Sequence, residues 1–111
     1  YFPGRRLIGI MGVFKDKEYE KIAQTMGTLM SVVYTVDLPD EKRGLPSEEL
    51  AEVLGKYCPC VKRPDVSGRQ EMVDCAVQAA LSEAGKEDVI IAFGSLSYLH
   101  WVKDAYDKAV W

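Results

Sequence analysis

Two almost uninterrupted apolar segments constrain the fold of this chain more than any other feature of its sequence. They are LIGIMGV, residues 7–13, and DVIIAF, residues 88–93. A strand with one face in water alternates apolar and polar residues, whereas a strand covered on both faces is apolar almost throughout. Both segments are therefore predicted to be strands inside a sheet that carries helices on its two faces.

The remaining chain alternates extended and helical patterns between these segments. SVVYTV, residues 31–36, is short and β-branched, and a weaker extended run covers residues 58–63. Apolar residues with helical spacing follow each of the four extended runs. The resulting order β-α-β-α-β-α-β-α calls for a parallel sheet with right-handed crossovers.

Polar residues mark where the helices are expected to begin. Ser47 is predicted to cap the second helix, with two glutamates in its first turn. Ser67 opens the third helix in a capping box. The last helix is predicted to bury a stripe made of Leu99, Val102 and Tyr106.

The two most apolar strands are expected to be neighbours, and the strand order 3-2-1-4 satisfies that requirement. The predicted fold class is a Rossmann-like, three-layer α/β/α domain with a mainly parallel sheet. Its topological switch point lies between the first and the fourth strand, and ligands of such sheets bind beyond the carboxyl ends of the strands there. We therefore expect the turns at Gly12–Lys17 and Gly94–Ser95 to face each other across a shared cleft.

The length, net charge and cysteine content of the chain favour a single domain that binds neither nucleic acid nor metal. A chain of 111 residues suits one domain, and a net charge of −3 argues against nucleic-acid binding. No apolar run approaches the ~20 residues that span a membrane, so a cytoplasmic protein is expected. The three cysteines have no metal-binding spacing and are expected to be reduced, with Cys58 and Cys60 on one face of a strand.

The common catalytic and nucleotide-binding motifs do not fit this chain. Gly9 and Gly12 lack the spacing of a dinucleotide-binding loop, and no phosphate-binding P-loop is present. The single histidine, His100, falls inside the predicted last helix and is expected to have a structural or surface role. No catalytic residue and no metal site are therefore predicted within these residues.

Two short motifs at the switch point allow two interpretations each. Asp16, within Lys15–Lys17, is either the cap of the first helix or part of a binding wall, and Ser95 is either the cap of the last helix or an anion ligand. A helix N-terminus with a serine is a good anion site. Lys17 opposite Ser95 would then hold a carboxylate or a phosphate.

Three segments together resemble a known family. GIMGVFKDKEYEKI (residues 9–22), LPSEEL (45–50) and DVIIAFGSLSYL (88–99) resemble the C-terminal domain of folylpolyglutamate synthase, which is often bifunctional with dihydrofolate synthase and belongs to the Mur ligase superfamily. The resemblance covers nearly the whole chain. It implies that residues 1–111 are the closing domain on the glutamate side, without the upstream ATPase domain and without the first part of their own sheet.

The resemblance also implies an activity for the full-length enzyme. That enzyme would join the amino group of L-glutamate to a carboxylate of a folate, which ATP activates as an acyl phosphate with Mg²⁺ present. An N-terminal ATPase domain in cis would bind most of the nucleotide and the metal. The present residues alone would then be catalytically incomplete.

Three residues match the family's binding motifs. Asp16 and Lys17 match its D-K pair, and Ser95 matches the serine of its G-S-L motif. The resemblance implies that Ser95 contacts a carboxylate of the incoming glutamate, that Lys17 offsets anionic charge, and that Asp16 orients Lys17 or caps the helix. Glu18 stands where aspartate is more usual, and His100 where glycine is common.

Two other functions stay open at this point. One is a sister ligase that adds an amino acid to a peptidoglycan precursor, and the other is a non-catalytic α/β binding module of receiver-like or flavodoxin-like type. The fourth strand is also expected to lie at the sheet edge when no upstream strand covers it. Exposed apolar edges favour self-association.

Overall fold

The computed structural model describes residues 6–16, 18–39, 42–64, 66, 68–85, 88–94 and 98–110, with the side chain of residue 110 excepted. Strands and helices alternate along this part of the chain, as the sequence predicts. Their bounds are β1 Leu7–Met11, α1 Tyr19–Gly27, β2 Val32–Thr35, α2 Ser47–Leu54, β3 Val61–Lys62, α3 Arg69–Glu83, β4 Val89–Phe93 and α4 Leu99–Val110.

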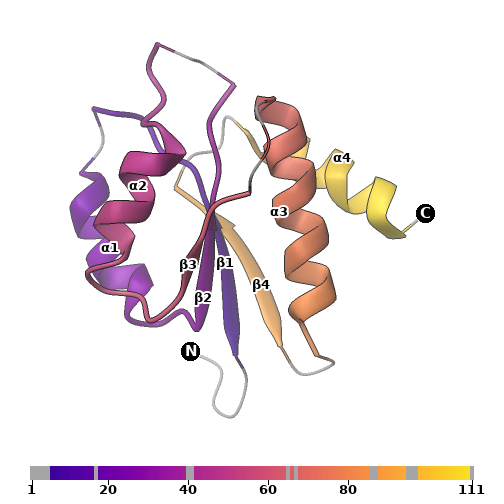
Figure 1. The fold of residues 1–111 in the computed structure, drawn as a ribbon, viewed down its shortest axis with the longest axis horizontal. Coiled ribbons are helices and arrows are strands. Elements are labelled where there is room, and N and C mark those ends of the chain that lie inside the picture. Colours follow the sequence, from indigo (N-terminus) through magenta and orange to yellow (C-terminus); the bar gives the residue numbers. More distant parts are fainter. Residues whose placement is uncertain are drawn as a thin grey trace.

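The four strands form one parallel sheet in the order β3-β2-β1-β4, which confirms the predicted fold class and strand order. Ile8 of β1 pairs with Val32 of β2 on one side and with Ile90 of β4 on the other. Helices α1 and α2 cover one face of the sheet, and α3 and α4 lie on the other (Figure 1). The three layers follow from strands that are apolar on both faces.

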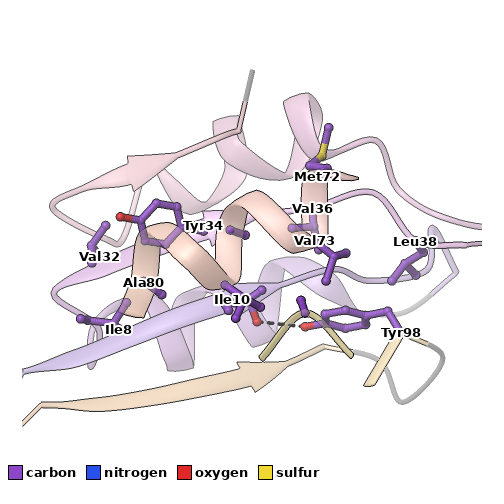
Figure 2. Packing of buried hydrophobic residues seen from close by; sticks show 13 residues of the cluster. Ile8, Ile10, Val32, Tyr34, Val36, Leu38, Met72, Val73, Ala80 and Tyr98 are labelled. Carbon is purple, nitrogen blue, oxygen red and sulfur yellow. Dashed lines mark hydrogen bonds between the residues drawn. The ribbon is translucent and has the colours of Figure 1, made fainter. Parts of the chain in front are cut away.

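Side chains from alternate positions of the central strands enter two separate cores. Ile8 and Ile10 point toward α3 and α4, whereas Leu7 and Met11 point toward α1 and α2. All five residues of β1 are buried. Figure 2 shows the core on the α3 and α4 side, which residues of β1, β2, α3 and the start of α4 build together.

Strand β4 occupies one edge of this sheet. Its five residues are apolar, yet each of them is only half-buried. The strand pairs with β1 along its whole length, and none of the strands in the described part of the chain pairs with its other side. Within the described residues, one row of backbone groups of this apolar strand thus has no partner strand.

Helix α2 begins differently from the prediction. Ser47 is the first helical residue rather than the cap, and the cap position belongs to Pro46. The carboxylate of Asp37 accepts a hydrogen bond from the Ser47 amide at 2.7 Å. The Ser47 hydroxyl is consequently available to accept a hydrogen bond from Arg63 Nε, also at 2.7 Å. Asp37, which follows β2, therefore accepts the hydrogen bond of a free amide at the start of α2 in place of the Ser47 side chain.

The other predicted caps also differ. Glu18, not Asp16, occupies the cap position of α1, and it forms no side-chain capping bond. Gly68 occupies the cap position of α3, again without a side-chain bond, and Ser67 lies outside the described residues. The residues at the cap positions of α1, α2 and α3 thus differ from Asp16, Ser47 and Ser67, whereas the Ser95 cap of the last helix stays a prediction.

The predicted apolar stripe of α4 is only partly buried. Leu99 and Tyr106 are 38% and 48% exposed, and Val102 is half-buried. These side chains line an open apolar groove of about 360 Å³ between α3, β4 and α4. Tyr98 and Ala105 enter the core in their place. The helix is rotated relative to the predicted stripe because it packs chiefly against α3.

Cys58 and Cys60 do not lie on one face of a strand as the sequence predicts, although their thiols are free. All three cysteines have free thiols. Cys58 enters the core beside α1 and α2, whereas Cys60 packs against the opposite core. The Cys58 amide donates to the Leu54 carbonyl at 2.8 Å, so this residue lies in the turn that follows α2 and not in a strand. The alternation expected of a strand does not apply there.

A cluster of ion pairs closes the amino end of the sheet. Arg6, just before β1, binds Asp88 through Nη2 at 2.8 Å and through Nε at 3.1 Å. Glu83, at the end of α3, accepts hydrogen bonds from the Tyr34 hydroxyl at 3.0 Å and from Lys62 Nζ at 3.1 Å. Arg6 also donates to the Glu83 carbonyl. The cluster thus connects residues at or next to all four strands.

Both carboxylates of this cluster have a lowered pKa. For Glu83 the main cause is the hydrogen bond from Lys62. For Asp88 the main cause is the Gly85 amide, followed by the Arg6 side chain. A carboxylate whose folded pKa lies below its unfolded pKa stabilises the fold above the unfolded value and loses that contribution as the pH falls.

No described helix combines the length and the apolar composition that crossing a membrane requires.

The first prediction concerns acid stability. Glu83→Gln removes a group that favours the folded state only when ionised, so unfolding free energy should depend less on pH between about pH 5 and pH 2. The loss at neutral pH should stay below about 1 kcal/mol, because the carboxylate is partly solvated. Denaturant titrations at pH 7 and pH 3 measure both quantities. Glu52→Gln, on the exposed side of α2, is the matched control, and equal pH profiles for the two variants would contradict the prediction.

The second prediction concerns the open strand. The isolated chain is expected to self-associate through β4 at high concentration, because an unpaired apolar edge pairs readily with another edge. Ile91→Lys should suppress this association, since a lysine on an edge strand opposes pairing. Leu29→Lys replaces an apolar side chain that is 48% exposed after α1, and it is the control. Sedimentation equilibrium distinguishes the variants, and a wild-type chain that stays monomeric would refute the idea.

Candidate functional site

The ends of β1 and β4 meet in direct backbone contact at the carboxyl edge of the sheet. The Gly12 amide donates to the Phe93 carbonyl at 3.4 Å. Gly94 follows with a φ of +103°, and it is the one residue with a positive φ among those described. A Cβ atom on Gly94 would collide with the Gly12 carbonyl oxygen. The first residues of the two turns, Gly12 and Gly94, thus lie in direct contact, and the predicted cleft between the rest of the turns stays a prediction.

A buried tyrosine reinforces this junction. Tyr98 is fully buried, and its hydroxyl lies 2.5 Å from the Phe93 carbonyl oxygen and 2.9 Å from the Ile10 carbonyl oxygen. Figure 2 shows its hydrogen bond to Ile10 of β1. Burial raises the pKa of the Tyr98 hydroxyl well above its ordinary value. The hydroxyl therefore stays protonated, and its single hydrogen is shared between the carbonyl oxygens at the ends of the two strands.

The segment after β1 is covered by the loop that follows β2. Phe14 forms an antiparallel bridge with Gly44. The Lys15 amide donates to the Arg43 carbonyl at 2.8 Å. The Arg43 guanidinium lies 4.6 Å from the centre of the Phe14 ring and 4.0 Å from the Asp16 carboxylate. These contacts place the positive charge of Arg43 beside the residues that follow β1.

A second set of polar contacts lies along the same edge. Asp37 follows β2, Ser47 begins α2 and Arg63 follows β3, and the hydrogen bonds described above connect them in that order. Ser47 is fully buried and is satisfied through both its amide and its hydroxyl. The ends of β2 and β3 are thus fixed relative to each other, as Tyr98 fixes those of β1 and β4.

The predicted site residues are described only in part. Asp16 lies at this edge, where it is exposed and approaches Arg43 instead of capping α1. Lys17 and Ser95 lie outside the described residues. Their neighbours in the sequence, Asp16 and Gly94, both follow strands that end at this edge. The assignment of Lys17 and Ser95 to glutamate therefore stays a prediction.

Sequence reasoning missed two residues of this edge. Arg43 has no local sequence signal, because nothing in the residues around it shows that this segment turns back onto Phe14. Tyr98 precedes the apolar stripe predicted for the last helix and was left outside it. A signal for Tyr98 did exist, since a large aromatic residue follows the G-S-L segment directly after the second apolar strand.

The described residues hold no group of three or more histidine, cysteine, aspartate or glutamate side chains that could bind a metal. His100 is exposed and contacts the ring of Trp101 at 5.9 Å between centroids. Its predicted surface role agrees with this position.

Comparison with known proteins gives consistent findings. A family model described as "Mur ligase, glutamate ligase domain" matches residues 1–96. No curated protein sequence matches the chain. Its structure is similar to that of Escherichia coli FolC in complex with DHPP and ADP, with a TM-score of 0.76 and 25% identity over 93% of this chain and 22% of that chain.

Two further solved structures share the fold. Mycobacterium tuberculosis folylpolyglutamate synthase complexed with ADP and AMPPCP has a TM-score of 0.70 and 21% identity over 95% of this chain and 24% of that chain. The folylpolyglutamate synthase of Thermotoga maritima has a TM-score of 0.61 and 21% identity over 96% of this chain and 22% of that chain. The present chain thus spans less than a quarter of the length of these enzymes.

The third prediction tests the junction of the two glycines. Gly94→Ala should destabilise the fold by at least about 1–2 kcal/mol, because the left-handed conformation disfavours a Cβ atom and the added methyl group meets the Gly12 carbonyl. Gly85→Ala is the control, since its added Cβ would make only ordinary contacts, 3.6 Å from Asp88. Urea unfolding measures the difference, and equal losses for both variants would show that the junction is not strained.

Proposed function

Since the chain belongs to the Mur ligase family of glutamate ligase domains, we propose that the protein containing it is a cytoplasmic, ATP-dependent carboxylate–amine ligase that adds L-glutamate to a folate. The present residues are its C-terminal closing domain, on the glutamate side. The observation that carries this proposal is the family match together with the structural similarity to FolC along 93% of the chain.

The proposed substrates follow from the ligands of similar enzymes. FolC was solved with DHPP and ADP, and the Mycobacterium tuberculosis enzyme with ADP and AMPPCP. We assign ATP as the phosphoryl donor and Mg²⁺ as its counter-ion, both bound mainly by an N-terminal ATPase domain in cis. In the reaction, a folate carboxylate takes the terminal phosphoryl group of ATP and releases ADP. The neutral amine of glutamate then attacks the acyl phosphate, and phosphate leaves as the amide forms.

The role of this domain is to hold the incoming glutamate beside that acyl phosphate. Glutamate has two carboxylates, which need cationic or hydrogen-bonding partners when they leave water. Lys17 supplies an ammonium group, Ser95 supplies a hydroxyl group, and Asp16 orients Lys17. Arg43, held between Phe14 and Asp16, adds positive charge to the same edge. The contact between Gly12 and Gly94 supports this assignment because it brings together the two strand ends that precede these residues.

The fourth prediction tests the function on the full-length protein. With ATP, a folate and glutamate, it should release ADP and form the glutamylated product, whereas the isolated 111-residue chain should be inactive. Lys17→Met and Ser95→Ala should each raise the KM for glutamate about tenfold or more, the cost of a lost charge-assisted hydrogen bond, with a smaller change in the KM for ATP. Lys15→Met, two residues away in the sequence, is the control.

Each alternative has its own outcome. Turnover with a peptidoglycan precursor in place of folate would identify a sister ligase. Absence of any glutamate-dependent turnover in the full-length protein would favour a binding module. Equal effects of the Lys15 and Lys17 variants would keep the ligase but remove Lys17 from the glutamate site.

A further inference from the structure

We propose that Tyr98 is a positioning residue for the glutamate side of the site: its hydroxyl holds the carboxyl ends of β1 and β4 in the one arrangement that binds glutamate productively. This inference rests on the proposed function. It assigns a role to a residue outside the three site residues that the sequence suggests.

The first step of the argument is the position of the hydroxyl. It lies 2.5 Å from the Phe93 carbonyl oxygen and 2.9 Å from the Ile10 carbonyl oxygen. Phe93 is the last residue of β4, and Ile10 is the last residue but one of β1. Where a ladder of backbone hydrogen bonds stops, buried carbonyl groups need another donor. The single hydrogen of the Tyr98 hydroxyl lies between the two strands, where both carbonyl oxygens can accept it.

The second step is the connection with Gly12 and Gly94. The Phe93 carbonyl that approaches the Tyr98 hydroxyl also accepts the Gly12 amide. Gly94, the next residue, is pressed against the Gly12 carbonyl in a left-handed conformation. The tyrosine thus fixes the same peptide groups from which the predicted ligand-binding turns depart. Three residues separate Gly94 from Tyr98 in the sequence, so both flanks of that segment are held against the end of β1.

The third step separates positioning from simple core packing. The aromatic ring of Tyr98 belongs to the core between the sheet and helices α3 and α4, with Leu38 and Val73 in the same cluster (Figure 2). Phenylalanine at this position keeps the ring and removes only the hydroxyl. Both carbonyl groups then lose the hydroxyl donor, and the Phe93 carbonyl keeps the long contact with the Gly12 amide at 3.4 Å. A loss of core packing would lower only the melting temperature. A shift of the ends of β1 and β4 would also raise the KM for glutamate.

The experiment compares two tyrosines of the same region in the full-length protein. Tyr98→Phe should raise the KM for glutamate about tenfold while the KM for ATP stays within twofold, because misplacement of binding groups weakens binding at the displaced site first. Tyr106→Phe is the control, since Tyr106 is 48% exposed on α4 and should give wild-type values. Both variants are assayed at 25 °C and at 10 °C, and their melting temperatures are recorded.

The outcomes are distinct. A raised glutamate KM in the Tyr98 variant at both temperatures supports the proposal. A lowered melting temperature with an unchanged glutamate KM, or a variant that fails to fold at 10 °C, would show a purely structural role and overturn it. Equal KM changes for glutamate and ATP would also overturn it. If the wild-type protein shows no glutamate-dependent turnover, the proposed function fails first, and this result is recognisable before any variant is made.

Discussion

The pairing of β1 with β4, and the close approach of Gly12 and Gly94 where it ends, is the constraint on which the structure depends. Parallel pairing aligns the two strands from Leu7–Val89 to Met11–Phe93. It brings together turns that lie about eighty residues apart in the sequence. Because Gly94 has no Cβ, the second turn can rest directly on the backbone of the first. A bulkier contact would separate the ends and leave no common edge for a ligand.

The two ends of the sheet are held by different chemistry. Ion pairs with partly exposed side chains join Arg6 to Asp88 and Lys62 to Glu83 at the amino end. Buried or half-buried hydrogen bonds hold the carboxyl end, through Tyr98. Such bonds tolerate little displacement, because an unmet buried group is costly. The carboxyl end of the sheet is thus held by less accessible hydrogen bonds than the amino end.

Membership of the Mur ligase family explains several features that are unusual for a free-standing domain. The match over residues 1–96 confirms the resemblance that the motifs of the chain indicate. Strand β4 is apolar but half-exposed, and the groove beside α4 is apolar and open. The chain spans less than a quarter of the length of the folylpolyglutamate synthases that share its fold.

The sequence by itself determined the layers, the parallel strand order and the family. Strands covered by helices on both faces must be apolar at almost every position, and the helices that cover them must carry an apolar stripe, so both patterns are visible in the sequence. Only the tertiary structure decided the contacts of Ser47 and Asp16, because their partners lie far away in the sequence. The Ser47 amide binds the Asp37 carboxylate, and the Asp16 carboxylate lies near the Arg43 guanidinium. Local rules predict a helix cap from adjacent residues alone. Such rules do not predict that the hydroxyl of Tyr98, just before α4, lies against carbonyl oxygens of β1 and β4. That contact forms only when the two strands pair in the folded sheet.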